Sequence, residues 1–289
     1  MDSVLVTGAS FGLGLEISLH LAERGFDVYA TVPDLSERGP LDETAAKRGV
    51  RVNVARLDVT DPQSIDAVVA AMVERSGGVY GVVNNAGIAL RGYFEDLLEE
   101  EIRRVFEVNV FGSAAVTRAV LPHMRAAGRG RIVFITSIGG RVGAPAVSAY
   151  ASSKFAQEGF GESLSQELRP FGIYVSLVEP GIIPTERFGA HRGFSHRALD
   201  PGSPYHAWFL ESQRLTDRLV ESSPTKPGHV ARAVHQALTA RRPKLRYVVG
   251  RRAALVLLLR RYLPGETFER IYFGEVMRRI TRPSRKPAE

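Results

Sequence analysis

Residues 3–24 read SVLVTGASFGLGLEISLHLAER, and their pattern decides the fold class. A short apolar strand over Ser3–Thr7 enters a turn that contains Gly8, Gly12 and Gly14, and an amphipathic helix follows over Leu15–Arg24. Glycine lets the backbone turn tightly and approach a bound group closely. A strand, a glycine-rich turn and a helix in this order place a pyrophosphate at the N-terminus of the helix. The stretch therefore predicts an α/β fold that binds a dinucleotide.

The same turn also fits a second pattern, because residues 8–12 read G-A-S-F-G and match the G-x-S-x-G elbow of serine hydrolases. A hydrolase would need an acid and a histidine later in the chain, and several histidines between His123 and His235 permit that order. The turn follows the first strand, however, so no earlier strand and loop can supply an oxyanion hole. This position argues against the hydrolase.

Six further apolar segments resemble strands, and helical patterns separate most of them. Such alternation predicts a parallel sheet covered by helices on both faces. We predict a three-layer α/β fold of Rossmann type, with a doubly wound, seven-stranded parallel sheet in a single domain over residues 1–289. The six segments are Asp27–Val32, Val50–Leu57, Val79–Val83, Arg131–Thr136, Tyr174–Val178 and Leu245–Val249. The helices expected between or after them include Gln63–Arg75, Phe94–Asn109, Val110–Ala127, Ser148–Leu168 and Pro227–Ala240.

Polar or glycine-containing turns follow several of these strands directly. Asn84-Asn85-Ala86-Gly87 follows the fourth strand, Ser137 follows the fifth, and Glu179–Thr185 begins where the sixth ends. The carboxyl ends of parallel strands share one rim, where open α/β sheets bind their ligands. Asn109 stands instead within an apolar helical run, where its side chain competes for backbone hydrogen bonds. We expect a kink or a buried amide there.

Tyr150 and Lys154 belong to the helical segment that opens with Ser148. Residues four apart share one face of a helix. A free phenol has a pKa of about 10 and exchanges protons poorly at neutral pH. A nearby ammonium favours the phenolate and lowers that pKa, so the pair can serve as a general acid and base. The same spacing also occurs by chance on surface helices.

Composition and charge set outer limits on function. The chain has 289 residues and no cysteine, which excludes disulfides and thiolate–metal sites. The start of the chain shows no export signal. The net charge of +7 is uneven: from Arg241 onward there are 14 Lys or Arg and 4 Asp or Glu, a local +10, and the remainder carries −3. A basic end can favour nucleic acid, an acidic membrane surface or an anionic substrate, but base-stacking aromatics are not interleaved with it.

Two segments lie outside the strand–helix alternation. Residues 186–225 are rich in His, Pro, Gly and Ser, which indicates a substrate-binding lid. Residues 251–289 form a basic helical extension. Its apolar run of seven, bracketed by arginine pairs within Arg251–Leu263, is too short to span a bilayer, so we expect a packed helix rather than one lying on a membrane. A final amphipathic helix is expected over Thr267–Ile280. The aromatic residues of the first segment, which form either part of a ligand site or a small satellite core, are Phe188, Phe194, Tyr205, Trp208 and Phe209.

Taken together, these residues resemble the short-chain dehydrogenase/reductase family over Thr7 to Thr185. A narrower similarity links Val28–Val32 and the portion from Arg246 onward to the 17β-hydroxysteroid dehydrogenase and retinol dehydrogenase branch. The motifs that carry the family resemblance are Thr7-Gly8-x-x-x-Gly12-x-Gly14, Asp58, Asn84-Asn85-Ala86-Gly87, Asn109, Ser137, Tyr150-x-x-x-Lys154 and Pro180-Gly181-x-Ile183-x-Thr185.

The resemblance implies a role for each catalytic residue. Tyr150 would be the acid/base and Ser137 would hydrogen-bond the substrate oxygen. Lys154 would hold the nicotinamide ribose and lower the pKa of the tyrosine. Asn109 would distort its helix and order a water that carries the proton onward. Asp58 would meet the adenine, Asn84, Ala86 and Gly87 the ribose region, and Ile183 and Thr185 the carboxamide. The implied cofactor-binding set is Gly8, Ser10, Phe11, Gly12, Leu13, Gly14, Asp58, Val59, Asn85, Ala86, Gly87, Tyr150, Lys154, Pro180, Gly181, Ile183 and Thr185.

The implied activity is NAD(P)-dependent interconversion of a ketone and a secondary alcohol, on a bulky apolar substrate such as a steroid, retinoid or polyketide. The cofactor would be NADP(H) or NAD(H), with NADP(H) slightly preferred; NADP-preferring members of the branch have an arginine where this chain has Pro33. Two other functions stay open: an NAD(P)-binding sensor or scaffold without turnover, and an epimerase or dehydratase that uses the same tyrosine. We also expect a cytoplasmic homodimer or homotetramer through Val110–Ala127 and Ser152–Leu168, with no bound metal, no nucleic acid and at most peripheral membrane contact through the basic end.

Overall fold

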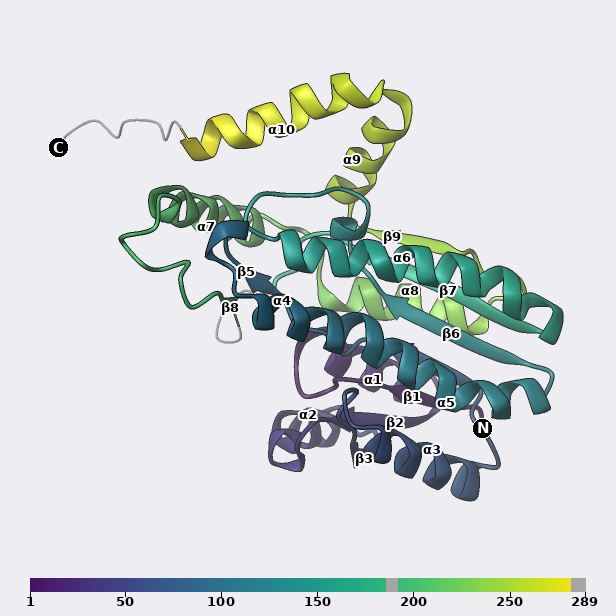
Figure 1. Ribbon diagram of the computed structural model, residues 1–289. Helices are drawn as coiled ribbons and strands as arrows, with labels where there is room; N and C mark the ends of the chain where they lie inside the picture. The colour runs from purple at the N-terminus through teal and green to yellow at the C-terminus, as the bar shows by residue number, and fades with distance from the viewer. Residues whose placement is uncertain (186–191, 282–289) are drawn as a thin grey trace.

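A computed structural model describes residues 1–185 and 192–281. Its centre is a seven-stranded sheet in which every neighbouring pair is parallel, in the order β3-β2-β1-β4-β6-β7-β9 (Figure 1). The order reverses between β1 and β4, which creates the crevice where doubly wound sheets bind ligands. The predicted fold class is confirmed. The strands are β1 (Ser3–Val6), β2 (Asp27–Val32), β3 (Asn53–Arg56), β4 (Gly81–Asn84), β6 (Gly130–Ile135), β7 (Ile173–Pro180) and β9 (Arg246–Val249).

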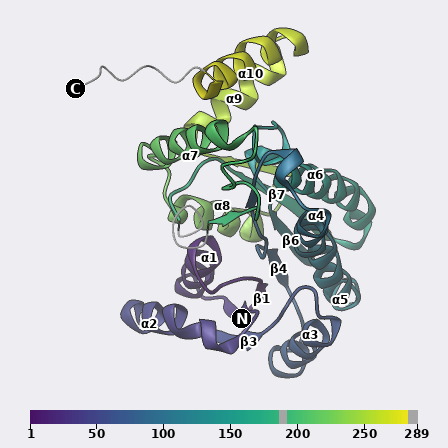
Figure 2. The same ribbon diagram turned by 60° about the vertical axis from the view of Figure 1, so that its left-hand side comes forward.

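Helices cover both faces of this sheet, as the turned view shows (Figure 2). One face packs against α1 (Gly12–Glu23), α2 (Gly39–Arg48) and α8 (Pro227–Thr239). The other face packs against α3 (Pro62–Ser76), α5 (Ser113–Ala126) and α6 (Ser148–Leu168). The sheet is therefore buried on both sides, which is why its strands are almost uniformly apolar.

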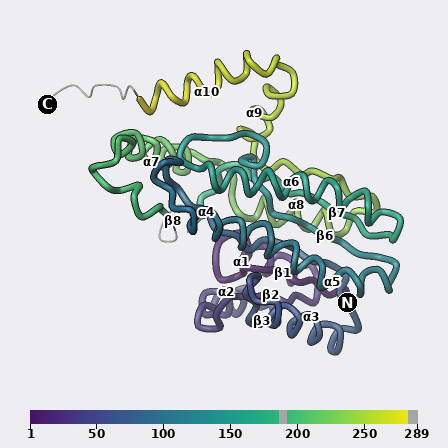
Figure 3. The backbone as a smooth tube through the Cα atoms, in the orientation of Figure 1, coloured from purple at the N-terminus to yellow at the C-terminus, as the bar shows by residue number. Residues whose placement is uncertain are grey.

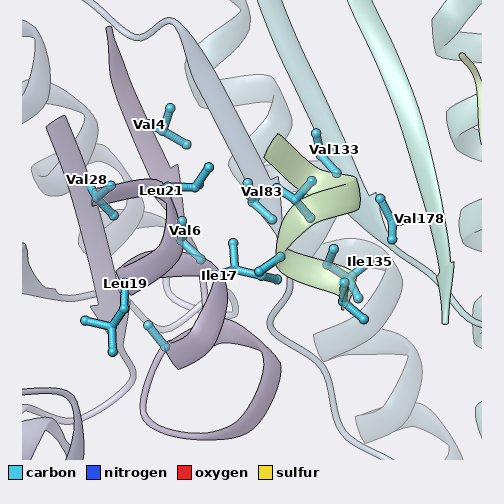
Figure 4. Packing of buried hydrophobic residues seen from close by; sticks show 14 of the residues in the cluster. Val4, Val6, Ile17, Leu19, Leu21, Val28, Val83, Val133, Ile135 and Val178 are labelled. Atoms are coloured by element: carbon cyan, nitrogen blue, oxygen red, sulfur yellow. The ribbon is translucent and has the colours of Figure 1, made fainter. Parts of the chain in front are cut away.

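Alternation along each strand divides the core into two layers. Val4 and Val6 of β1 point toward α1 and α8, whereas Leu5 between them points toward the opposite face. Figure 4 shows the first layer, in which valines of five strands meet Ile17, Leu19 and Leu21 of α1. Because the side-chain period of a strand is two residues, a slip of one residue would move each set to the wrong layer. The packing thus fixes the register that aligns the strand ends at the rim.

Local signals explain several element boundaries. α3 begins at Pro62, and the Asp61 carboxylate accepts a hydrogen bond from the Gln63 N–H at 3.1 Å. Aspartate before a first-turn proline is a strong helix start. The helix ends at Gly77, whose φ of 74° lies in the left-handed region that suits glycine. The third strand is shorter than expected, since only Asn53–Arg56 pair within the segment Val50–Leu57.

The segment 94–126 differs from the two helices expected there. A short 3₁₀ turn, η2 (Phe94–Asp96), precedes α4 (Glu99–Phe106), and a π-helical turn, η3 (Glu107–Gly112), joins α4 to α5. The wide turn contains Asn109, the residue that the sequence marked as out of place. Elements that the sequence did not indicate are α2, the short turns η1 (Leu35–Arg38), η4 (Ile138–Gly140) and η5 (Arg169–Phe171), and a small parallel pair of β5 (Leu90–Arg91) with β8 (Gly193–Phe194).

The end of the chain leaves the sheet and folds back above it (Figure 3). α9 (Arg251–Tyr262) rises from β9, and α10 (Gly265–Thr281) crosses over α7 (His206–Glu221). The expectation of a packed helix over Arg251–Leu263 is wrong, because Ala253 is the only buried residue of α9. Leu255, Leu258 and Leu259 face outward, since α9 touches little beyond β9 and α10. No helix within residues 1–185 and 192–281 is long and apolar enough to cross a membrane.

Candidate active site

A cavity of about 570 Å³ lies at the carboxyl ends of the strands. Its inner part is formed by the glycine-rich turn and by the turns after β3, β4, β6 and β7. Its outer part is formed by residues 142–147, by α7 and by α10. Its position at the reversal of strand order is the one expected for a ligand site in this fold.

The glycine-rich turn cannot carry side chains at two positions. A Cβ on Gly8 would lie 2.9 Å from the Ala86 Cα, and one on Gly14 would lie 2.1 Å from the Gly8 carbonyl oxygen. Gly8 also has a φ of 68°, which favours glycine. α1 begins here without a side-chain hydrogen bond at its start and without an acidic residue in its first turn. The exposed N–H groups and helix dipole suit an anion such as a pyrophosphate.

A network of hydrogen bonds joins this turn to the one after β4. Asn85 Nδ2 donates to the Thr7 and Gly8 carbonyl oxygens at 2.9 and 2.8 Å. Thr7 Oγ1 accepts from the N–H groups of Asn85 and Ala86 at 3.1 and 3.0 Å. Asn84 points the other way, toward Thr117 Oγ1 at 3.0 Å, and does not line the cavity. The implied contact of Asn84 with a ribose is therefore not supported by its orientation.

Two carboxylates lie where the resemblance places the adenosine half of the cofactor. Asp58 accepts from the N–H and hydroxyl of Thr60 at 2.9 and 2.8 Å. Burial acts to raise the pKa of Asp58, but these hydrogen bonds hold it below its usual value. Glu37 lines the same region and accepts from Ser10 Oγ at 2.8 Å. The sequence did not mark Glu37 as a site residue. Only the folded turn η1 brings its carboxylate close to the glycine-rich turn.

Tyr150, Lys154 and Ser137, three residues to which the resemblance assigns catalysis, all line the cavity, and we call them the catalytic corner. Lys154 Nζ lies 5.8 Å from the centroid of the Tyr150 ring, so the ammonium and the phenol share one side of α6. A Cβ on Gly139 would lie 3.3 Å from Ser137 Oγ and 3.5 Å from Tyr150 Cε1. The small residue at 139 thus leaves room between the two hydroxyl-bearing side chains for a substrate oxygen.

Lys154 is almost fully buried, with 5% of its surface exposed. Its ammonium donates to the Ile135 carbonyl oxygen at 2.9 Å and to Gln157 Oε1 at 2.8 Å. Buried ammonium groups need such partners because desolvation is costly. The lysine is thereby fixed with its charge beside the catalytic corner.

Asn109 lies behind this corner and is completely buried. Its amide accepts from the Ile88 N–H at 2.7 Å and donates to the Ile88 carbonyl and to Ser153 Oγ, each at 2.9 Å. The asparagine therefore holds the turn after β4 against α6. It does not line the cavity, and it is the one catalytic residue implied by the resemblance that lies outside it.

The outer part of the cavity is mainly apolar, and the partly buried Arg91 also lines it. Arg91 donates to Gln213 Oε1 at 2.9 Å, and burial together with the charge of Arg192 lowers the pKa of Arg91 to about 10. Burial also raises the pKa of Tyr272. The apolar side chains of this part are Ile88, Val142, Pro145, Val147, Leu215, Leu219, Tyr272, Phe273, Val276 and Ile280.

The described aromatic side chains of the expected lid pack into a small core of their own, apart from the cavity. The Tyr93 and Tyr205 rings stack with centroids 4.9 Å apart, and Phe194 meets Phe209 at 5.4 Å. The cavity is not lined by any of Phe194, Tyr205, Trp208 and Phe209. Phe188 lies outside the described residues. The apolar wall comes instead from α7, from the loop before α6 and from α10. The sequence indicated the helix α10 but not that it lines this cavity, because its residues are more than a hundred positions from Tyr150.

A buried charge cluster supports the turn after β7. Glu179 is fully buried and lies 3.0 Å from Arg141 Nη1 and 3.3 Å from Arg246 Nε. Arg246 Nε also pairs with Glu158 at 3.0 Å. Burial, followed by the charge of Glu158, raises the pKa of Glu179 to about 7. Next along the chain are Pro180 and Gly181, which line the cavity.

The structure brings together the whole predicted cofactor-binding set. Every residue of that set lines the cavity, as does Ser137. The glycine turn supplies the phosphate end, Asp58 and Val59 one side, and Pro180 to Thr185 the far side. Within the described ranges, no group of three or more His, Asp or Glu side chains is arranged to hold a metal ion.

The fold and this cavity define an α/β protein with a ligand cavity at the ends of its strands, lined by a tyrosine–lysine pair. The profile of the short chain dehydrogenase family matches residues 2–193, and the chain belongs to that family. The oxidoreductase YusZ of Bacillus subtilis strain 168, itself uncharacterised, is 39% identical over 270 residues, covering 92% of this chain and 95% of the relative. Human 17-beta-hydroxysteroid dehydrogenase type 1 is 36% identical, covering 89% and 80%.

Solved structures agree with this assignment. A short-chain dehydrogenase from Streptomyces avermitilis has a TM-score of 0.78 and 36% identity, covering 96% of this chain and 99% of that one. A short chain dehydrogenase/reductase from Burkholderia phymatum in complex with NAD has a TM-score of 0.78 and 25% identity, covering 100% and 96%. The chain is therefore an oxidoreductase of this family with a nicotinamide cofactor.

Proposed function

We propose that the protein interconverts a ketone and a secondary alcohol on a bulky apolar substrate, with Tyr150 as the general acid and base. The supporting observation is that Tyr150 and Lys154 lie between a phosphate-binding turn and an apolar outer cavity. Relatives named as retinol and 17-beta-hydroxysteroid dehydrogenases, 34% and 36% identical to the chain, agree with an apolar alcohol or ketone.

Each residue of the corner has a defined task in this reaction. The bound nicotinamide supplies or takes up the hydride at the carbon that bears the oxygen. In the direction of reduction, Tyr150 donates its phenolic proton to the developing alkoxide, and Ser137 donates a hydrogen bond to the same oxygen. Lys154 stabilises the resulting phenolate by its charge and would hold the ribose hydroxyls. The apolar wall excludes water from the reacting carbon.

Glu37 favours NAD(H) over NADP(H). Its carboxylate accepts from Ser10 Oγ beside the glycine turn, at the adenosine end of the cavity. An acid in this region hydrogen-bonds a ribose 2′-hydroxyl and repels a 2′-phosphate. Asp34 and Arg38, the other charged residues near the end of β2, do not line the cavity; Arg38 pairs with Asp42 at 2.6 Å. We therefore revise the slight preference for NADP(H) and propose NAD(H).

Replacing the tyrosine tests the mechanism. Tyr150→Phe is expected to lower kcat by about a hundredfold to ten-thousandfold, because it removes the proton donor. Its Kd for NADH should stay within about twofold of the wild-type value, since the cofactor groups remain. Turnover would be followed by nicotinamide absorbance with a panel of steroid ketones, retinoids and bulky aliphatic ketones. Undiminished turnover in the variant would refute the role of Tyr150, and tight NADH binding without turnover of any compound by the wild type would favour a sensor.

We also propose a homodimer through α5 and α6. Two phenylalanines support it: Phe111, next to the start of α5, is 59% exposed, and Phe155 of α6 is 41% exposed. Phe111 lies on η3, which packs against α6, and large apolar side chains left open on neighbouring elements are suited to an interface between copies.

The exposed face of α9 supports peripheral contact with an acidic lipid surface. Leu255, Leu258, Leu259 and Tyr262 are 55%, 53%, 41% and 71% exposed, and their spacing places them on one side of the helix. Arginine pairs stand at both ends of α9. Pairing of this face with a second copy would bring arginines together in either orientation, whereas anionic headgroups would neutralise them. The charge pattern therefore favours a membrane surface.

A further inference from the structure

Gln157 connects the catalytic lysine to the π-helical turn. It follows Lys154 by three residues on α6 and is completely buried. Gln157 Oε1 accepts from Lys154 Nζ at 2.8 Å, and Gln157 Nε2 donates to the Asn109 carbonyl oxygen at 2.6 Å. One side-chain amide thus spans the distance between the ammonium and the main chain of η3.

The orientation of this amide is fixed by chemistry. An ammonium can only donate hydrogen bonds and a carbonyl oxygen can only accept them. Rotating the amide by 180° would turn Nε2 toward Lys154 Nζ and Oε1 toward the Asn109 oxygen, so both contacts would become repulsive. The oxygen end therefore belongs to the lysine, and the bond to it is charge-assisted.

The Asn109 carbonyl oxygen has a second side-chain partner. Ser113 Oγ donates to it at 2.8 Å, and Gln157 Nε2 also lies 3.3 Å from Ser113 Oγ. Ser113 Oγ also lies 2.9 Å from the Val110 carbonyl oxygen, so its single proton is shared between two acceptors. Gln157 links Lys154 Nζ directly to the Asn109 carbonyl oxygen. The family resemblance implied a water ordered by Asn109 in this part of the site.

We propose that Gln157 is a positioning residue that replaces a bridging water and holds Lys154 in place for the cofactor ribose. The proposal rests on the proposed function, because Lys154 matters only if a nicotinamide ribose binds beside it. The Ile135 carbonyl and Gln157 Oε1 together fix the ammonium. A bridging water could pass a proton on. A side-chain amide does not ionise near neutral pH, so Gln157 orders the lysine without relaying a proton.

Two substitutions at 157 distinguish a bridge from a space-filling side chain. Gln157→Leu keeps most of the volume and removes both hydrogen bonds. Gln157→Ala leaves a gap next to Lys154 Nζ, Ser113 Oγ and the Asn109 oxygen, and three polar partners are enough to hold a water. If Gln157 only fills space, the alanine variant should be the worse one, because it creates a cavity. If Gln157 bridges, a water restores the bridge in the alanine variant and the leucine variant is the worse one.

The measurements are the Kd for NADH by fluorescence titration and kcat with the best ketone from the panel. We expect Gln157→Leu to raise Kd and to lower kcat, each by about tenfold, because the lysine loses its position. We expect Gln157→Ala to stay within about threefold of the wild type for both. Gln157→Met provides a second apolar variant should the branched leucine prevent folding, which circular dichroism would reveal.

Ser113→Ala is the matched control, because it removes the other donor to the Asn109 oxygen and leaves the contact between Lys154 and Gln157 in place. Its Kd for NADH should change by less than about twofold. Three outcomes for Kd and kcat would overturn the proposal. Ser113→Ala could have the same effect as Gln157→Leu, or Gln157→Ala could be no better than the leucine or methionine variant. All variants could also behave like the wild type. A wild-type protein that binds neither NADH nor NADPH would instead overturn the proposed function, and this inference with it.

Discussion

At the residue scale, the proposed preference for NAD(H) depends on one side chain. This is Glu37, whose carboxylate reaches Ser10 only after the chain has passed through β2 and the turn η1. Asp34 is closer to the end of β2, yet its side chain accepts from the Ser36 N–H and remains at the surface. The proximity of a charge in the sequence is therefore a poor guide to its proximity to a ligand.

Removal of the Glu37 charge should relax the preference for NADH. Glu37→Gln keeps the size of the side chain and removes its repulsion of a 2′-phosphate, so the Kd for NADPH should fall by about tenfold or more while that for NADH rises slightly. Titration of NADH and NADPH on the same protein preparation measures the ratio of their two dissociation constants.

Asp34→Asn serves as the control, since that carboxylate does not line the cavity. An unchanged ratio of the two dissociation constants in Glu37→Gln would show that the carboxylate does not face the 2′ position.

At the scale of one element, the end of β7 carries a titratable group beneath the cofactor turn. The folded-state pKa of Glu179 is about 7, above the usual value of 4.5, chiefly because the carboxyl is buried. An acid whose pKa is raised by folding stabilises the fold below its unfolded pKa and loses this contribution as pH rises through the folded pKa. The relevant window is therefore pH 4.5 to 7.

The free energy of unfolding should fall across this window by up to about 3 kcal/mol through Glu179 alone. Glu179→Gln cannot titrate, so its denaturation midpoints in urea should change less between pH 5 and pH 8 than those of the wild type. Glu162→Gln removes an exposed partner of the same Arg246 and should keep the wild-type slope. If the urea midpoints of the wild type and of Glu179→Gln changed equally with pH, the explanation by a buried carboxyl would be contradicted.

The π-helical turn shows where prediction from sequence stops. An asparagine within an apolar helix signalled an irregularity at residue 109, and the structure has one there. The sequence did not show that the turn would direct a main-chain oxygen toward Gln157, because that contact joins two helices 48 residues apart. Local patterns indicate that a helix is disturbed, while tertiary packing decides what the disturbance contacts.

Across the whole molecule, the parts predicted best are those with short-range signals. The glycine turn, the spacing of Tyr150 and Lys154, and the strand alternation each lie within one or two elements, and the fold and inner cavity followed from them. The outer cavity could not be predicted in the same way. The apolar face of α10 was visible as a period of three to four residues, but such a period does not say what the face covers.

Contact with acidic lipid can be tested on the intact chain. The protein should sediment with vesicles that contain a quarter phosphatidylglycerol and should remain in solution with pure phosphatidylcholine vesicles. Added salt should weaken the binding, because part of it comes from arginine charges. Leu258→Glu places a charge in the exposed stripe and should reduce the bound fraction severalfold.

Phe94→Glu is the matched control, because Phe94 is 72% exposed and lies on η2, outside α9. Sedimentation velocity without vesicles separates a lipid-binding face from a face that pairs two copies. Loss of self-association in Leu258→Glu, with vesicle binding unchanged, would count against the lipid surface.

The matched family profile ends at residue 193, whereas the roof of the cavity comes from α7 and α10, which both follow it. Much of the outer apolar wall therefore follows Tyr150 and Lys154 along the chain, although Ile88 and residues 142–147 precede them. Substitutions after residue 193 can therefore change much of the roof while Tyr150, Lys154 and Ser137 stay the same. Related proteins can in this way come to accept different substrates while the residues that carry out the reaction stay the same.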